Sequence, residues 1–156
     1  GPLYHLTEPA DRARTLAEAH RVLRPGGVLL AAGISRFASA LDGLSRDLLG
    51  DAAFAAIIAQ DLATGRHRND TARLDWFTTA YFHHPQELGR EVEAAGFRLD
   101  GVFGIEGPIW LLADLDRRWT DPAERERLLQ LARALETEPT LLGASAHLLA
   151  AATKPR

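Results

Sequence analysis

Apolar residues run without a break through segment 28–34, which reads Val-Leu-Leu-Ala-Ala-Gly-Ile. Such a run predicts a strand that is covered on both faces, because a strand with one wet face alternates apolar and polar side chains. The residues just before it predict a helix end and a tight turn, since Pro25 cannot continue a helix and Gly26 and Gly27 can supply positive φ. A helix, a turn and a buried strand in this order indicate an α/β protein.

Apolar residues at helical spacing predict further helices along the chain. The first runs over 8–23, with Thr7 as its cap and Pro9 in its first turn. The others are expected over 37–49, over 52–63, from Pro85 to the closing Gly96, and after Asp121-Pro122-Ala123-Glu124, which has the spacing of a capping box.

Strand-like patterns occupy segments 97–105 and 145–153. The polar segment 65–71 predicts an exposed, mobile connection. The aromatic segment 75–82 leaves two alternatives open, a short strand or an irregular wall of a pocket. Because the connection after the first strand is far longer than a usual crossover, we expect 37–82 to form a helical cap over the strand ends.

The motif Leu23-Arg24-Pro25-Gly26-Gly27, together with the upstream segment Gly1-Pro2-Leu3-Tyr4-His5-Leu6, resembles the middle of the class I S-adenosylmethionine-dependent methyltransferases. In that family the pattern "L-(K/R)-P-G-G" ends the helix before the fifth strand, and a short segment like 1–6 closes the fourth. The resemblance implies a partial Rossmann-like sheet with helices on both faces and a reversed, antiparallel strand pair at its edge. It also implies S-adenosylmethionine as cofactor and methyl transfer to a small molecule.

The glycine-rich turn that grips an adenosyl cofactor in such folds has no counterpart in the sequence. Gly101, Gly104 and Gly107 are spaced by threes inside a strand-like segment and open no helix, so they favour strand or bulge positions. The chain also contains no methionine. We therefore expect 1–156 to be the C-terminal half of a methyltransferase domain, with the cap at 37–82, and to be inactive alone.

The resemblance places segment 1–6 beneath the sulfonium of the cofactor, at the edge of the sheet where ligands bind. Gly1, Pro2 and Leu3 are accordingly expected to contact the cofactor, although Gly1-Pro2 can also be the remnant of a cleaved tag. His5 is expected to be catalytic, as the base that takes a proton from the acceptor. The alternative is a histidine that only hydrogen-bonds the backbone.

Five residues are expected to bind the methyl acceptor. Tyr4 lies beside His5, and Ser35 and Arg36 follow the buried strand, where Arg36 can pair with a carboxylate or simply bridge to an acidic neighbour. Tyr81 and His83 belong to an aromatic cluster that suits an apolar or aromatic substrate, and ordinary core packing is the alternative for the cluster. No metal site is expected, because adjacent histidines point apart on an extended strand.

Composition narrows the function classes. Hydrophobic residues make up 46% of the 156 residues, enough for one compact core, and the net charge of −3 disfavours a nucleic-acid substrate. The absence of cysteine excludes disulfides and thiolate chemistry. No apolar run is long enough to cross a bilayer and no secretory signal is present, so we expect no membrane partner and a cytoplasmic location.

A second function class stays open, in which the chain is a pseudoenzyme or a partner-binding module without enzymatic activity. Strands missing beside segment 1–6 would leave a sheet edge unpaired, and open edges recruit other chains. We expect self-association through this edge.

Overall fold

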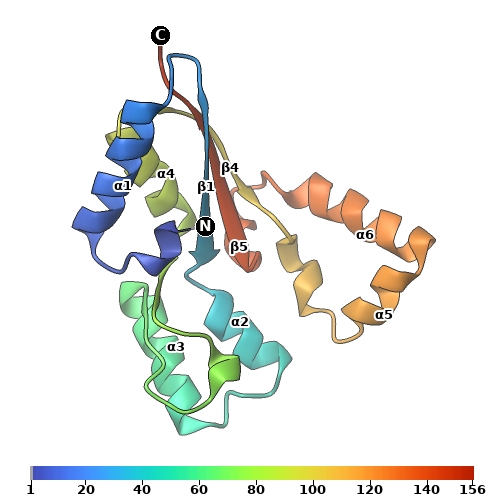
Figure 1. Ribbon diagram of the computed structural model, residues 1–156. Coiled ribbons are helices and arrows are strands. Elements are labelled where there is room, and N and C mark those ends of the chain that lie inside the picture. The colour runs from blue at the N-terminus through green and yellow to red at the C-terminus, as the bar shows by residue number, and fades with distance from the viewer. Residues whose placement is uncertain (1) are drawn as a thin grey trace.

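The computed structural model describes residues 2–156, which form an α/β fold around one mixed sheet (Figure 1). Within these residues the strand order is β2-β3-β1-β5-β4. The strands are β1 (Val28–Ser35), β2 (Arg66–His67), β3 (Ala80–His83), β4 (Arg98–Gly104) and β5 (His147–Thr153). The α-helices are α1 (Pro9–Val22), α2 (Ala38–Ser45), α3 (Ala52–Thr64), α4 (Pro85–Ala94), α5 (Leu115–Thr120) and α6 (Pro122–Leu135), and the short 3₁₀ helices are η1 (Leu3–His5), η2 (Leu74–Trp76), η3 (Gly107–Leu111) and η4 (Leu142–Ala144).

Strand β5 runs antiparallel to both of its neighbours, β1 and β4, so the reversed strand pair expected at the sheet edge is confirmed. On its other side β1 pairs in parallel with β3, at Ile34 and Ser35 alone within the described chain. Its backbone before Ile34 therefore lies along an open edge. The N-terminal segment is not the expected strand end but the 3₁₀ helix η1, in which the N–H groups of His5 and Leu6 donate to carbonyls three residues earlier.

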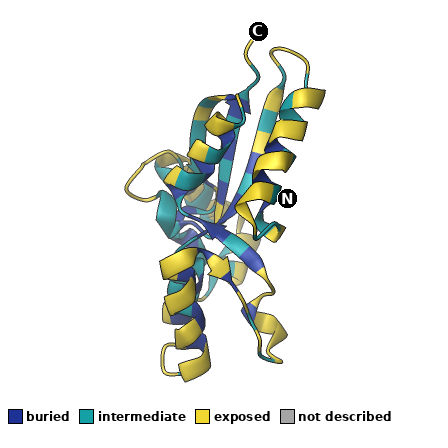
Figure 2. Ribbon diagram, turned by 90° about the vertical axis from the view of Figure 1, so that its left-hand side faces the viewer, coloured by how far each residue is buried: buried dark blue, intermediate teal, exposed yellow. Residues whose placement is uncertain are grey.

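Helices α1 and α4 cover one face of the sheet, where the main core lies (Figure 2). The buried residues of this core include Leu16, Leu88, Val92, Phe97, Leu148 and Ala150. On the opposite face Val28 and Leu30 are 60% and 63% exposed. The expectation of helices on both faces is thus met on one face within the described chain, because α1 and α4 both pack on the side of the main core.

The turn before β1 forms as predicted, although its two glycines serve different needs. Gly26 has a φ of +79° and needs the freedom of glycine. Gly27 does not have positive φ, but a Cβ there would lie 2.8 Å from the Arg24 carbonyl oxygen. Glycine is required at Gly27 for space and not for conformation.

Two predicted caps differ from the structure. The N-cap of α1 is Glu8, without a side-chain cap bond, so Thr7 does not cap this helix. At α6 Asp121 accepts hydrogen bonds from two backbone N–H groups, but Glu124 turns away to Arg118 and the reciprocal half of a capping box is missing. A full capping box is present at α4, between His84 and Glu87.

The segment 65–71, predicted as an exposed connection, begins with structured residues. Gly65 ends α3 in the left-handed region, and Arg66 and His67 form β2, which pairs with β3. His67 is fully buried, because its ring stacks on Phe82 of β3. Of the expected cap, α2 and α3 lie beyond the carboxyl end of β1, whereas β3 joins the sheet (Figure 1). No helix in residues 2–156 has the length and apolar character needed to cross a lipid bilayer.

Candidate functional site

A cavity of about 330 Å³ lies at the carboxyl end of β1. Ile34 of β1 and His147, its partner on β5, both line it. Ligands of open α/β sheets bind at this edge. Much of its wall is aromatic, and the residues concerned are Phe54, Trp76, Phe77, Phe82 and Trp110.

The aromatic wall is held by contacts within the protein. Phe54 and Trp76 meet edge to face with ring centroids 5.0 Å apart. Phe77 has a φ of +67°, a strained conformation that costs on the order of 1–3 kcal/mol in a residue other than glycine. The Asn69 amide holds the strained segment by donating to the carbonyl oxygens of Phe77 at 2.9 Å and Arg73 at 2.7 Å. The structure therefore maintains Phe77 at the wall against a local cost.

A buried polar group supports the same wall from behind. Oδ2 of Asp61 accepts a hydrogen bond from the Ser39 hydroxyl at 2.6 Å and lies 2.8 Å from Nδ1 of His67. The other ring nitrogen of His67 lies 3.0 Å from the Trp76 carbonyl oxygen. Both ring nitrogens of His67 are thus used inside the protein, and Ser39 and His67 do not contact each other as a nucleophile and its base would. This group orients the wall.

The second histidine of the cavity, His147, is arranged differently. Its Nδ1 lies 2.5 Å from Oε1 of Glu106, and its backbone N–H donates to Oε2 of Glu106 at 3.0 Å. Ser145 donates its hydroxyl to the same Oε2 at 2.8 Å. Within the described chain Nε2 of His147 has no hydrogen-bond partner, and the side chain is 55% exposed. One ring nitrogen is therefore held by a carboxylate while the other stays open to a ligand.

Glu106 and His147 each stabilise the charged form of the other. Burial would raise the pKa of the Glu106 carboxyl, but the hydrogen bonds from His147 and Ser145 outweigh it and hold that pKa below its ordinary value. The hydrogen bond to Glu106 raises the pKa of His147, against the effect of burial. A raised pKa makes the His147 imidazole a stronger base.

The mouth of the cavity carries a small charged cluster. Arg46 lies 3.0 Å from the carboxylates of both Asp42 and Asp75. All three side chains are partly exposed, so their ion pairs are screened by solvent and contribute little stability. The cluster makes the entrance polar while the wall inside is aromatic.

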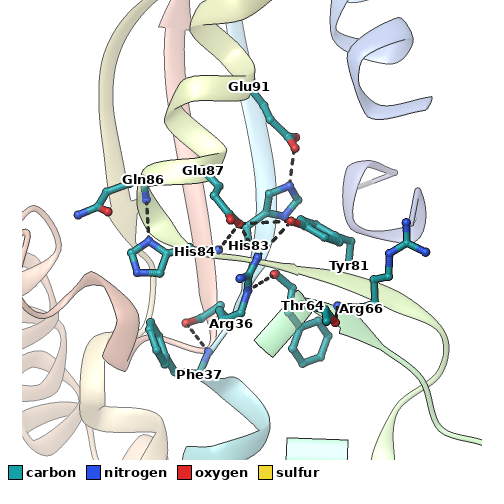
Figure 3. Close-up of polar contacts among 12 residues, drawn as sticks. Arg36, Phe37, Thr64, Arg66, Tyr81, His83, His84, Gln86, Glu87 and Glu91 are labelled. Carbon is teal, nitrogen blue, oxygen red and sulfur yellow. Dashed lines mark hydrogen bonds and ion pairs between the residues drawn. The ribbon is translucent and has the colours of Figure 1, made fainter. Parts of the chain in front are cut away.

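A separate network joins β1, β3 and α4 (Figure 3). The Arg36 guanidinium donates to the Tyr81 hydroxyl at 3.1 Å and to Oε2 of Glu87 at 2.5 Å. Its Nε donates to the Phe82 carbonyl oxygen at 3.0 Å. Arg36 thus takes the second of its predicted alternatives, a bridge to an acidic neighbour.

The network continues from β3 to α1. Nε2 of His83 lies 3.3 Å from Glu91, which also accepts from Arg12 at 2.8 Å, and the Arg12 guanidinium lies 3.6 Å from the centre of the Tyr81 ring. The Arg12 side chain is 2% exposed. Burial would raise the pKa of Glu91, but hydrogen bonds from His83 and Arg12 lower it to about 2. Glu91 is therefore a carboxylate that ties two helices and a strand together.

The predicted site residues fall into different environments. Arg36, Tyr81 and His83 come together in this network, and none of the three lines the aromatic cavity. Ser35 is buried and donates its hydroxyl to the Gly143 carbonyl oxygen at 3.0 Å. Their contacts with an acceptor stay predictions.

The N-terminal candidates are spread over η1. Leu3 is buried in the main core, and Tyr4 packs against the small cluster around Phe82. His5 is exposed and its ring centroid lies 4.6 Å from that of Tyr4, while Pro2 is exposed just before η1. Gly1 lies outside the described residues.

Glu106 and His147 are not among the residues singled out from the sequence. They stand 41 positions apart and meet only because β5 pairs with β4. One signal was available: the reversed strand pair implies that β5 begins beside the carboxyl end of β1, so a histidine at the start of β5 belongs to the ligand edge.

No family model and no curated protein matches the chain. The function is therefore argued from the geometry of the site.

Proposed function

We propose that this chain forms the acceptor side of a methyltransferase that uses S-adenosylmethionine and acts on a small molecule. The observation that carries the proposal is the aromatic cavity at the carboxyl end of β1. The turn motif at Leu23-Arg24-Pro25-Gly26-Gly27 and the antiparallel pair of β4 and β5 agree with it. The cavity takes the acceptor, and its aromatic wall orients a flat apolar group.

Contacts of Pro2 and Leu3 with the cofactor stay predictions. The Leu3 side chain is buried in the core, and the carbonyl oxygens of Pro2 and Leu3 already accept hydrogen bonds inside η1. We therefore assign the chain's residues roles toward the acceptor alone, in binding it, keeping water from it and holding its proton. A protein that aligns a methyl donor with its acceptor has to fulfil these roles.

The proposal is tested with the protein encoded by the whole reading frame that contains residues 1–156. The purified protein is incubated with methyl-labelled S-adenosylmethionine and a panel of small phenols, amines and carboxylic acids, and product is detected by mass spectrometry. Transfer to at least one acceptor is expected. Absence of transfer across the panel would contradict the proposal.

A pair of variants connects activity to the cavity. Phe77→Ala removes a ring that lines the cavity and is 43% exposed, and Trp119→Ala removes a ring of similar exposure, 42%, that lies on α5 outside it. The first should raise the KM for the acceptor, while the second should leave it unchanged. Equal effects of the two variants on the KM would show that the cavity does not bind the acceptor.

One observation favours the second candidate function, a partner-binding module. The backbone of β1 before Ile34 has no strand partner on its outer side within the described chain, and the side chains of Val28 and Leu30 in this stretch are exposed. Such an edge accepts a strand from another chain. The sequence encoded upstream of residue 1 distinguishes the two functions. A predicted strand followed by Gly-x-Gly-x-Gly and an acidic residue would support the methyltransferase, and the absence of such a unit would support the partner-binding module.

A further inference from the structure

His147 has the arrangement of a general base. Its Nδ1 is held by Glu106 at 2.5 Å, which fixes the ring orientation and stabilises the charge that forms when Nε2 takes a proton. Ser145 is fully buried and bonds to Glu106 at 2.8 Å, so the carboxylate is itself held in place. The chain therefore supports one ring nitrogen of this cavity-lining residue through two successive contacts, and the other has no hydrogen-bond partner within the described chain.

No other titratable side chain that lines the cavity in the described chain is equally suited to act as a base. His67, the other histidine of the wall, has both ring nitrogens occupied at 2.8 and 3.0 Å. Asp42 and Asp75 at the mouth are paired with Arg46 at 3.0 Å. Among the lining residues of the described chain, His147 alone combines a held ring with an open basic nitrogen.

The wall indicates which ligand this base serves. Five aromatic side chains around about 330 Å³ suit a small aromatic ring, which they can contact edge to face or stacked. A hydroxyl on that ring is acidic enough for imidazole to deprotonate, whereas an aliphatic hydroxyl holds its proton too tightly. A phenol therefore matches both the wall and the base.

We propose that the cavity binds a phenol and that His147, positioned by Glu106 and Ser145, is the catalytic base that removes its hydroxyl proton. The O–H bond breaks, its electron pair stays on the phenol oxygen, and the proton moves to Nε2 of His147. The resulting phenolate is the nucleophile that methyl transfer requires, and to that extent the inference rests on the proposed function. Binding and ionisation of the phenol are properties of this chain's own residues.

The test uses 4-nitrophenol, whose absorption differs between its neutral and ionised forms, and 4-nitroanisole, which has the same ring but no proton to lose. Binding of both to the purified protein is followed by quenching of tryptophan fluorescence, because Trp76 and Trp110 line the cavity. Ionisation is followed by absorption in a pH titration, which compares the apparent pKa of bound 4-nitrophenol with that of the free compound. The variants are His147→Gln and Glu106→Gln, with His20→Gln, distant on α1, as control.

The wild type is expected to bind both compounds and to convert bound 4-nitrophenol to phenolate. His147→Gln should lose the phenolate signal and keep its affinity for 4-nitroanisole, and Glu106→Gln should show a weaker signal at the same affinity. Phenolate formation that persists in His147→Gln, or disappears in His5→Ala instead, would overturn the assignment, as would a wild type that binds neither compound. Because no methyl donor is used, phenolate formation without methyl transfer would count against the proposed function alone.

Discussion

Replacing Glu91 with glutamine should destabilise the protein at neutral pH and remove part of its acid sensitivity. Glu91 accepts from the buried Arg12 at 2.8 Å and lies 3.3 Å from Nε2 of His83, so its carboxylate has hydrogen-bond partners on two sides. Folding lowers its pKa from 4.5 to about 2. At about 1.36 kcal/mol for each tenfold change in proton affinity, this difference corresponds to about 3 kcal/mol of folding free energy.

The sign follows from the direction of the pKa change. A carboxyl whose pKa is lower in the folded state stabilises the protein fully above its unfolded pKa, and this stabilisation is lost as the pH falls through the folded pKa. The Glu91 contribution is therefore complete at neutral pH, begins to fall near pH 4.5 and is largely lost near pH 2. The variant should be less stable at neutral pH by about 3 kcal/mol, a value typical of breaking a buried ion pair.

Urea unfolding followed by tryptophan fluorescence, repeated from neutral to acidic pH, measures this difference. Glu93→Gln is the matched control, because Glu93 lies on the same helix and is exposed. The curves of the wild type and Glu91→Gln should converge toward pH 2, while Glu93→Gln follows the wild type throughout. A gap between wild type and Glu91→Gln that stays the same at all pH values would refute the reasoning, since the loss would then come from packing and not from the charge.

Three further outcomes are expected. In calorimetry residues 1–156 alone should show no low-micromolar binding of S-adenosylmethionine, because the sequence has no glycine-rich cofactor turn, and a low-micromolar Kd would count against this. Light scattering should detect self-association through the open edge of β1, reduced by Leu30→Lys, and a wild type that stays monomeric over a wide concentration range would show that the edge is protected. Tyr81→Phe should cost on the order of 1 kcal/mol by removing the hydroxyl bonded to Arg36, without altering the affinity for 4-nitroanisole, whereas a tenfold loss of affinity would place Tyr81 at the acceptor.

The order of helices, turns and strands along the chain could largely be predicted from the sequence. Pro25 and Gly26 act on their own backbone, so the helix end and the turn before β1 could be predicted from those two residues. The helical segments and the strand segments that became β4 and β5 were predicted for the same reason, since side-chain period and turn residues are properties of neighbouring positions. The antiparallel pairing of these two strands was implied by the family resemblance and not by the pattern. Together they determined the α/β class.

The arrangement of the candidate site was decided by the tertiary structure. His67 belongs to a polar segment, yet it is buried because β2 pairs with β3 and the ring stacks on Phe82. Val28 and Leu30 belong to an apolar run, yet they are exposed because α1 and α4 cover the same face. Side chains far apart in sequence meet only when strand order and register bring them together, and for that reason the contact between Glu106 and His147 could be found in the fold and not in the pattern of either segment.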